Sequence, residues 1–73
     1  MREIRFHREL YQGEYVDEAI KVYDRYAKIG RAEEASHWVV TVEAGSPARE
    51  RKIADELANY ALGISIQKRR RSS

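Results

Sequence analysis

The sequence contains no cysteine among its 73 residues. It therefore has no disulfide bond and no thiolate ligand for a structural zinc ion. A chain of this length folds as one domain and buries only about 60% of the surface that its unfolded form exposes. We expect a single small domain over residues 1–66, of marginal stability, held together by its apolar core alone.

Long apolar runs are also missing. No segment approaches the roughly 18 consecutive apolar residues that a membrane-spanning helix needs. The first ten residues, MREIRFHREL, carry a charge at every second or third position, which excludes the apolar centre of a secretory signal. We therefore expect a cytoplasmic protein.

The excess of positive charge lies at the C-terminal end. The chain has 14 Lys and Arg against 12 Asp and Glu. Four of these basic residues are consecutive: Lys68, Arg69, Arg70 and Arg71. Without them ten basic residues remain against twelve acidic ones, a net charge of −2. We expect residues 67–73 to be a disordered, solubilising tail. The alternative is a nucleic-acid arm that contacts phosphates by releasing counterions.

Hydrophobic periodicity predicts five secondary-structure elements. Ile4 and Phe6 alternate with charged residues, as in a strand with one buried face. The segment WVVTVE, from Trp38, is partly apolar on both faces and predicts a central strand. Ser46 is a natural helix N-cap, and Pro47 suits the first helical position. The predicted elements are a strand over residues 2–8, a helix over 14–27, a short strand over 27–32, a strand over 37–43 and a helix from 47, which either ends at Gly63 or extends through residues 64–67.

We predict an α+β fold, a two-layer β-α-β-β-α sandwich. Its three-stranded mixed sheet has the order 1-3-2, and both helices lie on one face. Because the first strand rejoins the sheet after a helix, we expect it to lie parallel to the third strand through a right-handed crossover. If residues 27–32 form no strand, the sheet has two strands and one open face remains.

The face of this sheet that the helices leave open carries mixed residues. Val39 and Thr41 make it half-apolar, so a partner or a second copy of the chain would be an economical cover, although a solvated face fits equally well. A partner strand added to the sheet edge is the other expected contact. Replacing Val39 by Asp should then weaken partner binding and leave a folded monomer. The predicted partner-binding residues are Arg5, His7, Val39 and Thr41 on the face, and Ile29 and Arg31 at the edge.

No catalytic or metal-binding constellation is present in the sequence pattern. His7 and His37 are the only histidines, and a structural zinc site needs four ligands. We predict no catalytic residue, no metal and no cofactor. Residues 45–49 form the predicted N-terminus of a helix and, with Arg49 and Arg51, could hold a phosphate. The role of Ser46 as a helix cap accounts for the same residues without a ligand.

Short, mostly apolar motifs run through the whole chain. They are Phe6, Leu10–Tyr11, Ala19–Ile20, Tyr23, Trp38–Val39–Val40, Leu57, Asn59 and Leu62. Together they resemble the motifs of the HxsD-like proteins of His-Xaa-Ser peptide maturation systems. The similarity spans residues 4–66, and the chain departs from the family pattern at Gly63-Ile64-Ser65, where an aspartate and an arginine are usual. The resemblance implies a non-catalytic accessory protein that accompanies radical-SAM peptide-modifying enzymes and presents a peptide or docks an enzyme.

The expected function is therefore that of a non-catalytic accessory or binding module with a protein or peptide partner. Two alternatives stay open. One is a nucleic-acid-associated protein that uses the tail from Lys68 to Arg71, and the other is a structural homodimer.

Overall fold

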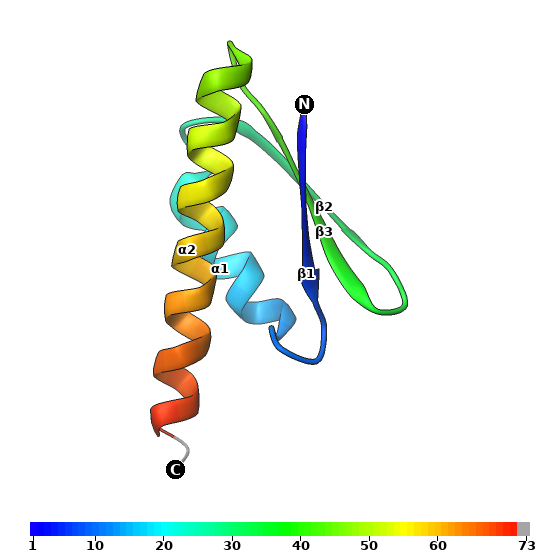
Figure 1. Ribbon diagram of the computed structural model, residues 1–73, viewed down its shortest axis with the longest axis vertical. Coiled ribbons are helices and arrows are strands. Elements are labelled where there is room, and N and C mark those ends of the chain that lie inside the picture. The colour runs from blue at the N-terminus through cyan, green and yellow to red at the C-terminus, as the bar shows by residue number, and fades with distance from the viewer. Residues whose placement is uncertain (72–73) are drawn as a thin grey trace.

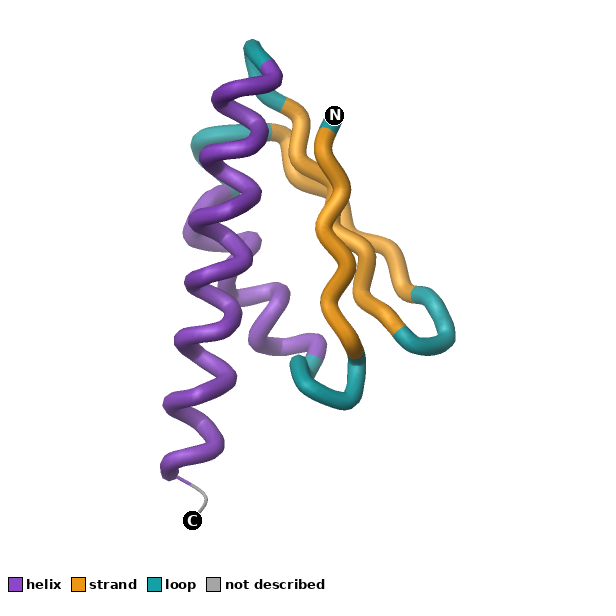
Figure 2. Tube along the Cα trace, in the orientation of Figure 1, coloured by secondary structure: helices purple, strands orange, loops and turns teal. Residues whose placement is uncertain are grey.

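Two helices cover one face of a three-stranded sheet (Figures 1 and 2). The computed structural model describes the backbone of residues 1–71 and the side chains of residues 1–68. The two-layer α+β class that the sequence predicts is confirmed, and so is the short second strand. The elements in chain order are β1 (Arg2–His7), α1 (Gly13–Tyr23), β2 (Lys28–Glu33), β3 (His37–Glu43) and α2 (Pro47–Arg71).

The strand order is β1-β3-β2, as predicted, but the sheet is antiparallel throughout. The expectation that β1 lies parallel to β3 is wrong. A helical crossover joins β1 to β2, and these two strands do run in the same direction, since both are antiparallel to β3. β3 follows β2 through a tight turn, so it runs back antiparallel and fills the space between β1 and β2.

α2 is longer than the sequence predicts. Gly63 does not end it, and the helix continues through residues 67–71, which were expected to be a disordered tail. The physical reason lies in the next turn, where Ile64 and Ser65 are buried. The Ser65 hydroxyl donates a hydrogen bond to the Leu10 carbonyl at 3.1 Å, which fixes this turn to the β1–α1 connection. Residues 72–73 of the predicted tail lie outside the described residues.

The core lies between the sheet and the helices. Trp38 anchors it, because its indole N–H donates to the Tyr11 carbonyl at 2.9 Å and its ring lies against the start of α1. A Cβ at Gly13 would approach the Trp38 ring to 3.1 Å, so any larger residue there would require the ring to shift by a few tenths of an ångström. The buried apolar residues of the cluster are Phe6, Val16, Ala19, Trp38, Val40, Val42, Ile53, Ala54, Leu57 and Ala61.

Candidate binding surfaces

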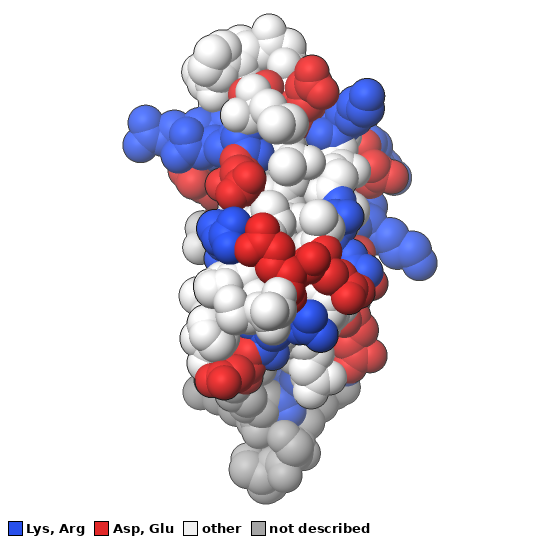
Figure 3. Space-filling model, turned by 90° about the vertical axis from the view of Figure 1, so that its right-hand side faces the viewer, with Lys and Arg blue, Asp and Glu red and all other residues white. Residues whose placement is uncertain are grey.

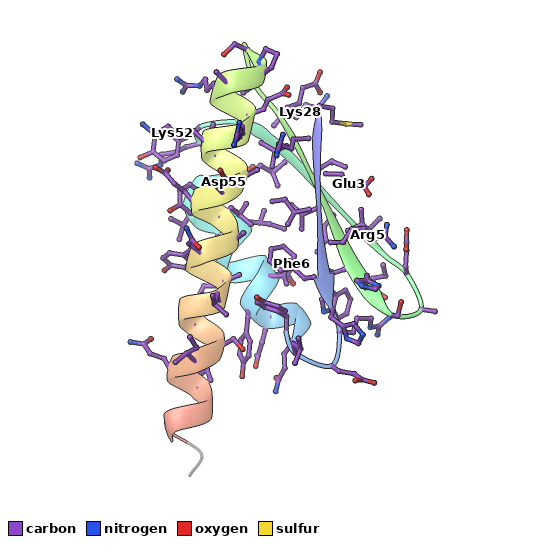
Figure 4. The ribbon with its side chains drawn as sticks, in the orientation of Figure 1. Glu3, Arg5, Phe6, Lys28, Lys52 and Asp55 are labelled. Carbon is purple, nitrogen blue, oxygen red and sulfur yellow. The ribbon has the colours of Figure 1, made fainter. Side chains whose placement is uncertain are left out.

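The outer face of the sheet holds four of the predicted partner-binding residues. Alternation along β1 and β3 places Arg5, His7, Val39 and Thr41 away from the helices. In Figure 4, Glu3 and Arg5 point away from the helix layer and Phe6 points toward it. The face as a whole presents acidic and basic side chains next to one another (Figure 3).

Arg5 covers the middle of this face. It lies opposite Val39 in the β1–β3 register, and its guanidinium group crosses β3 to form an ion pair with Glu34 beyond the end of β2. A second contact joins Arg5 Nη1 to the Glu3 carboxylate at 3.4 Å. Val39 is only 6% exposed. The expected half-apolar open surface is therefore wrong at Val39, because residues of the same chain already cover it.

His7 and His37 face each other across β1 and β3, with ring centroids 5.0 Å apart. The Glu9 backbone N–H donates to His7 Nδ1 at 3.2 Å, so this ring nitrogen acts as an acceptor. Among residues 1–71 no group of three or more His, Cys, Asp or Glu is placed to hold a metal ion.

Ile29 and Arg31 lie in β2, which is an edge strand of the sheet, but their side chains are not directed to the open edge. Their register partners in β3 are buried, so both side chains face the helix layer. Arg31 Nε lies 3.0 Å from the Asp17 carboxylate of α1, and its guanidinium group lies 5.1 Å from the Trp38 ring centroid. Ile29 packs against the core. The side chains at this edge attach α1 to the sheet and are not free for a partner.

The backbone of β1 offers unpaired hydrogen-bonding groups at the sheet edge. The Arg8 N–H donates to the Ser36 carbonyl at 2.9 Å, one step beyond the last pair of the β1–β3 register. Bonded and non-bonded pairs alternate in an antiparallel ladder. It follows that even-numbered residues of β1 bond to β3. The N–H and C=O groups of Glu3 and Arg5 and the N–H of His7 therefore point away from the sheet without a partner in β3, whereas the His7 carbonyl already accepts the Leu10 and Tyr11 N–H groups, each at 3.0 Å.

The same reasoning applies to β2. The Glu34 N–H donates to the His37 carbonyl at 2.9 Å, in register with the β2–β3 pairs. Ile29, Arg31 and Glu33 consequently direct their backbone groups outward. Ile29 and Arg31 were expected at the edge, where their backbone groups and not their side chains are available. Arg5 and His7 were expected on the open face, and they also lie in the other edge strand, β1.

A hollow of about 690 Å³ lies on the helix layer, between the end of α1 and the start of α2. The sequence did not predict this site. The charged residues of each helix are accounted for by that helix alone, and no local pattern shows which faces of the two helices lie next to each other. Burial raises the pKa of Tyr23 in this hollow, and the negative charge of Glu56 adds to the effect. Its basic and aromatic lining residues are Lys21, Arg25, Arg49, Lys52, Tyr23 and Tyr26.

The basic C-terminal end adds little to these surfaces in the described part of the chain. Lys68 lies in the last turns of α2, and the side chains of residues 69–71 lie outside the described ones. No helix in residues 1–71 combines the length and apolar character needed to span a membrane.

Comparisons with protein-family models, curated proteins and solved structures gave no match for this chain. The resemblance to HxsD-like proteins therefore stays a prediction.

Proposed function

We propose that this protein is a cytoplasmic, non-catalytic binding module that takes up a strand from a protein or peptide partner along the edge of β1. The observation that carries the proposal is the row of outward backbone groups on β1: the N–H groups of Glu3, Arg5 and His7 and the carbonyls of Glu3 and Arg5. Within residues 1–71, no strand lies on that side of β1. An extended peptide gains affinity at such an edge from main-chain hydrogen bonds.

The exposed side of α2 next to β1 favours β1 over β2 as the edge to which a partner strand would be added. α2 packs on β1 and β3, and Tyr60 contacts Tyr23 on its α1 side. Leu62, about 200° further round the helix, lies on the opposite flank and is 45% exposed. A strand added beside β1 would lie under this flank and cover Leu62. At β2, by contrast, the Arg31–Asp17 ion pair occupies the space between the edge and α1.

The partner that the resemblance implies is a peptide-modifying enzyme or its peptide substrate. The proposal itself requires only an extended segment of backbone. An unbiased peptide display library can therefore supply the probe, and the selected peptide can be synthesised and titrated into the labelled protein.

Two variants at one position test the edge. Glu3→Pro removes an outward N–H that makes no bond to β3, whereas Glu3→Ala removes the same side chain and keeps the N–H. We expect Glu3→Pro to weaken the selected peptide by about tenfold or more, since it removes a hydrogen bond and adds a clash. Glu3→Ala should bind like the original protein. Equal binding by both variants, or peptide-induced NMR shifts away from β1, would contradict the proposal.

A second copy of the chain is the second candidate partner, favoured by the charges of β1 itself. If two β1 strands pair antiparallel about a twofold axis at Ile4, Glu3 of each copy lies opposite Arg5 of the other. Opposite charges in directly facing positions stabilise such a pair. The double variant Glu3→Arg/Arg5→Glu keeps this complementarity, whereas Arg5→Glu alone destroys it.

Sedimentation equilibrium distinguishes the two partners. A homodimer predicts that the original protein and the double variant associate and that Arg5→Glu does not. Monomeric behaviour of all three at high protein concentration would exclude the homodimer and leave the edge for another partner.

A further inference from the structure

The hollow between α1 and α2 carries positive charge that the fold does not neutralise. Lys21, Arg25, Arg49 and Lys52 line it, and none of them forms an ion pair within the described residues. Asp17 lies one helical turn before Lys21 but pairs with Arg31 instead. Glu56 is the one acidic residue of the lining.

Helix stability explains only part of this charge. Lys21 near the C-terminal end of α1 suits the helix dipole, but Arg49 and Lys52 lie in the first turns of α2, where positive charge is unfavourable. The helix N-terminus is not itself a free site, since the Ser46 hydroxyl already accepts the Arg49 N–H at 3.2 Å. The basic side chains, which come from α1, the turn after it and α2, are therefore available to a negatively charged ligand.

Exposed aromatic surface lies beside these charges. Tyr26 is 50% exposed, and its ring centroid lies 6.4 Å from that of Tyr23. Val22, which also lines the hollow, is exposed as well. A volume of about 690 Å³ is within the range of small-molecule sites. The lining thus combines a surface for a planar ring with charges for an anion.

We propose that this hollow binds a small organic phosphate with a planar ring, of the nucleoside diphosphate class. The phosphates contact the basic side chains of both helices, and the ring lies against Tyr26. The negative charge of Glu56 repels a ligand that consists of phosphate alone. The contact between the ring and Tyr26 therefore adds to affinity, and inorganic pyrophosphate binds more weakly than the nucleotide. This site is separate from the β1 edge and does not depend on the function proposed above.

Titration of the isotope-labelled full chain with adenosine diphosphate, followed by NMR, tests the proposal. We expect saturable shifts at the amides of the hollow and none at Glu3, Arg5 or His7. Lys52→Gln should weaken binding by about fivefold or more, because a charge-assisted phosphate contact is lost. The matched control is Lys28→Gln, which removes the same charge from β2, outside the hollow, and should leave the affinity unchanged.

Two further titrations complete the test. One distinguishes the contribution of the ring from that of the phosphates, and the other distinguishes a nucleotide ligand from a nucleic acid. Tyr26→Ala should weaken adenosine diphosphate and leave pyrophosphate unaffected. Shifts that do not saturate, or equal loss in Lys52→Gln and Lys28→Gln, would overturn the proposal. So would a single-stranded oligonucleotide that shifts the hollow when adenosine diphosphate does not.

Discussion

Glu50 is one of two polar side chains that are buried in the described part of the chain. Its carboxylate accepts the Ala44 N–H at 3.0 Å and lies 3.1 Å from the N-terminal ammonium group. The Ala44 hydrogen bond and, after it, the ammonium group lower the pKa of Glu50 below its ordinary value. Folding therefore favours the charged form of this residue.

Glu50→Gln should lower stability in a pH-dependent way. A lowered pKa contributes stability that is complete above the ordinary glutamate pKa of 4.5 and is lost as the pH falls through the lower pKa of the folded protein. Urea unfolding should show a less stable variant at pH 7, with the difference from the original protein shrinking toward pH 3. Glu43→Gln, at an exposed position in β3, is the control. An equal loss at both pH values would contradict the role of the charge.

Val39 tests whether the outer face is free or already covered. Because it is 6% exposed beneath the Arg5–Glu34 ion pair, Val39→Asp buries a carboxylate and should destabilise the fold by about 2 kcal/mol or more. Ala32→Asp, at the exposed register partner in β2, should change stability far less. Thermal unfolding of both variants gives the answer. A stable Val39→Asp monomer would restore the open apolar face expected from the sequence.

The elements and the strand order are largely readable from the sequence, but the direction of β1 relative to β3 is not. Alternation around Ile4 and Phe6 and the cap at Ser46 locate β1 and the start of α2 because these signals are local. The error at β1 came from applying the crossover rule to β1 and β3, although the helical connection joins β1 to β2. The full length of α2 was not predicted, because the hydrogen bond from Ser65 to the Leu10 carbonyl joins it to a loop that is distant in the sequence.

Truncation tests the extent of α2. A chain ending at residue 66 keeps Ile64 and Ser65, whereas one ending at 62 loses the burial of Ile64 and the hydrogen bond to Leu10. We expect the longer chain to stay close to full stability and the shorter one to lose about 2 kcal/mol or more. Circular dichroism during urea unfolding measures both. Equal stability would show that the helix beyond Leu62 adds nothing to the fold.

On the scale of the whole molecule, the candidate binding surfaces lie on different layers. The β1 edge belongs to the sheet, and the hollow belongs to the two helices. From the sequence Arg5 and His7 could be assigned to the outer face of the sheet, because strand alternation separates the two faces, but the free backbone groups of β1 could not be predicted. The hollow could not be predicted, since it exists only where Lys21 on α1 and Lys52 on α2 come together.

Hydrogen exchange at the β1 amides tests the central claim most directly. In a dilute sample of the full chain, the amides of Ile4 and Phe6 should be protected by β3, and those of Glu3, Arg5 and His7 should exchange rapidly. Addition of a display-selected peptide should protect the second group and leave the first unchanged. Protection of Arg5 and His7 in the dilute free protein, or no gain when the peptide binds, would contradict a free β1 edge as the binding surface.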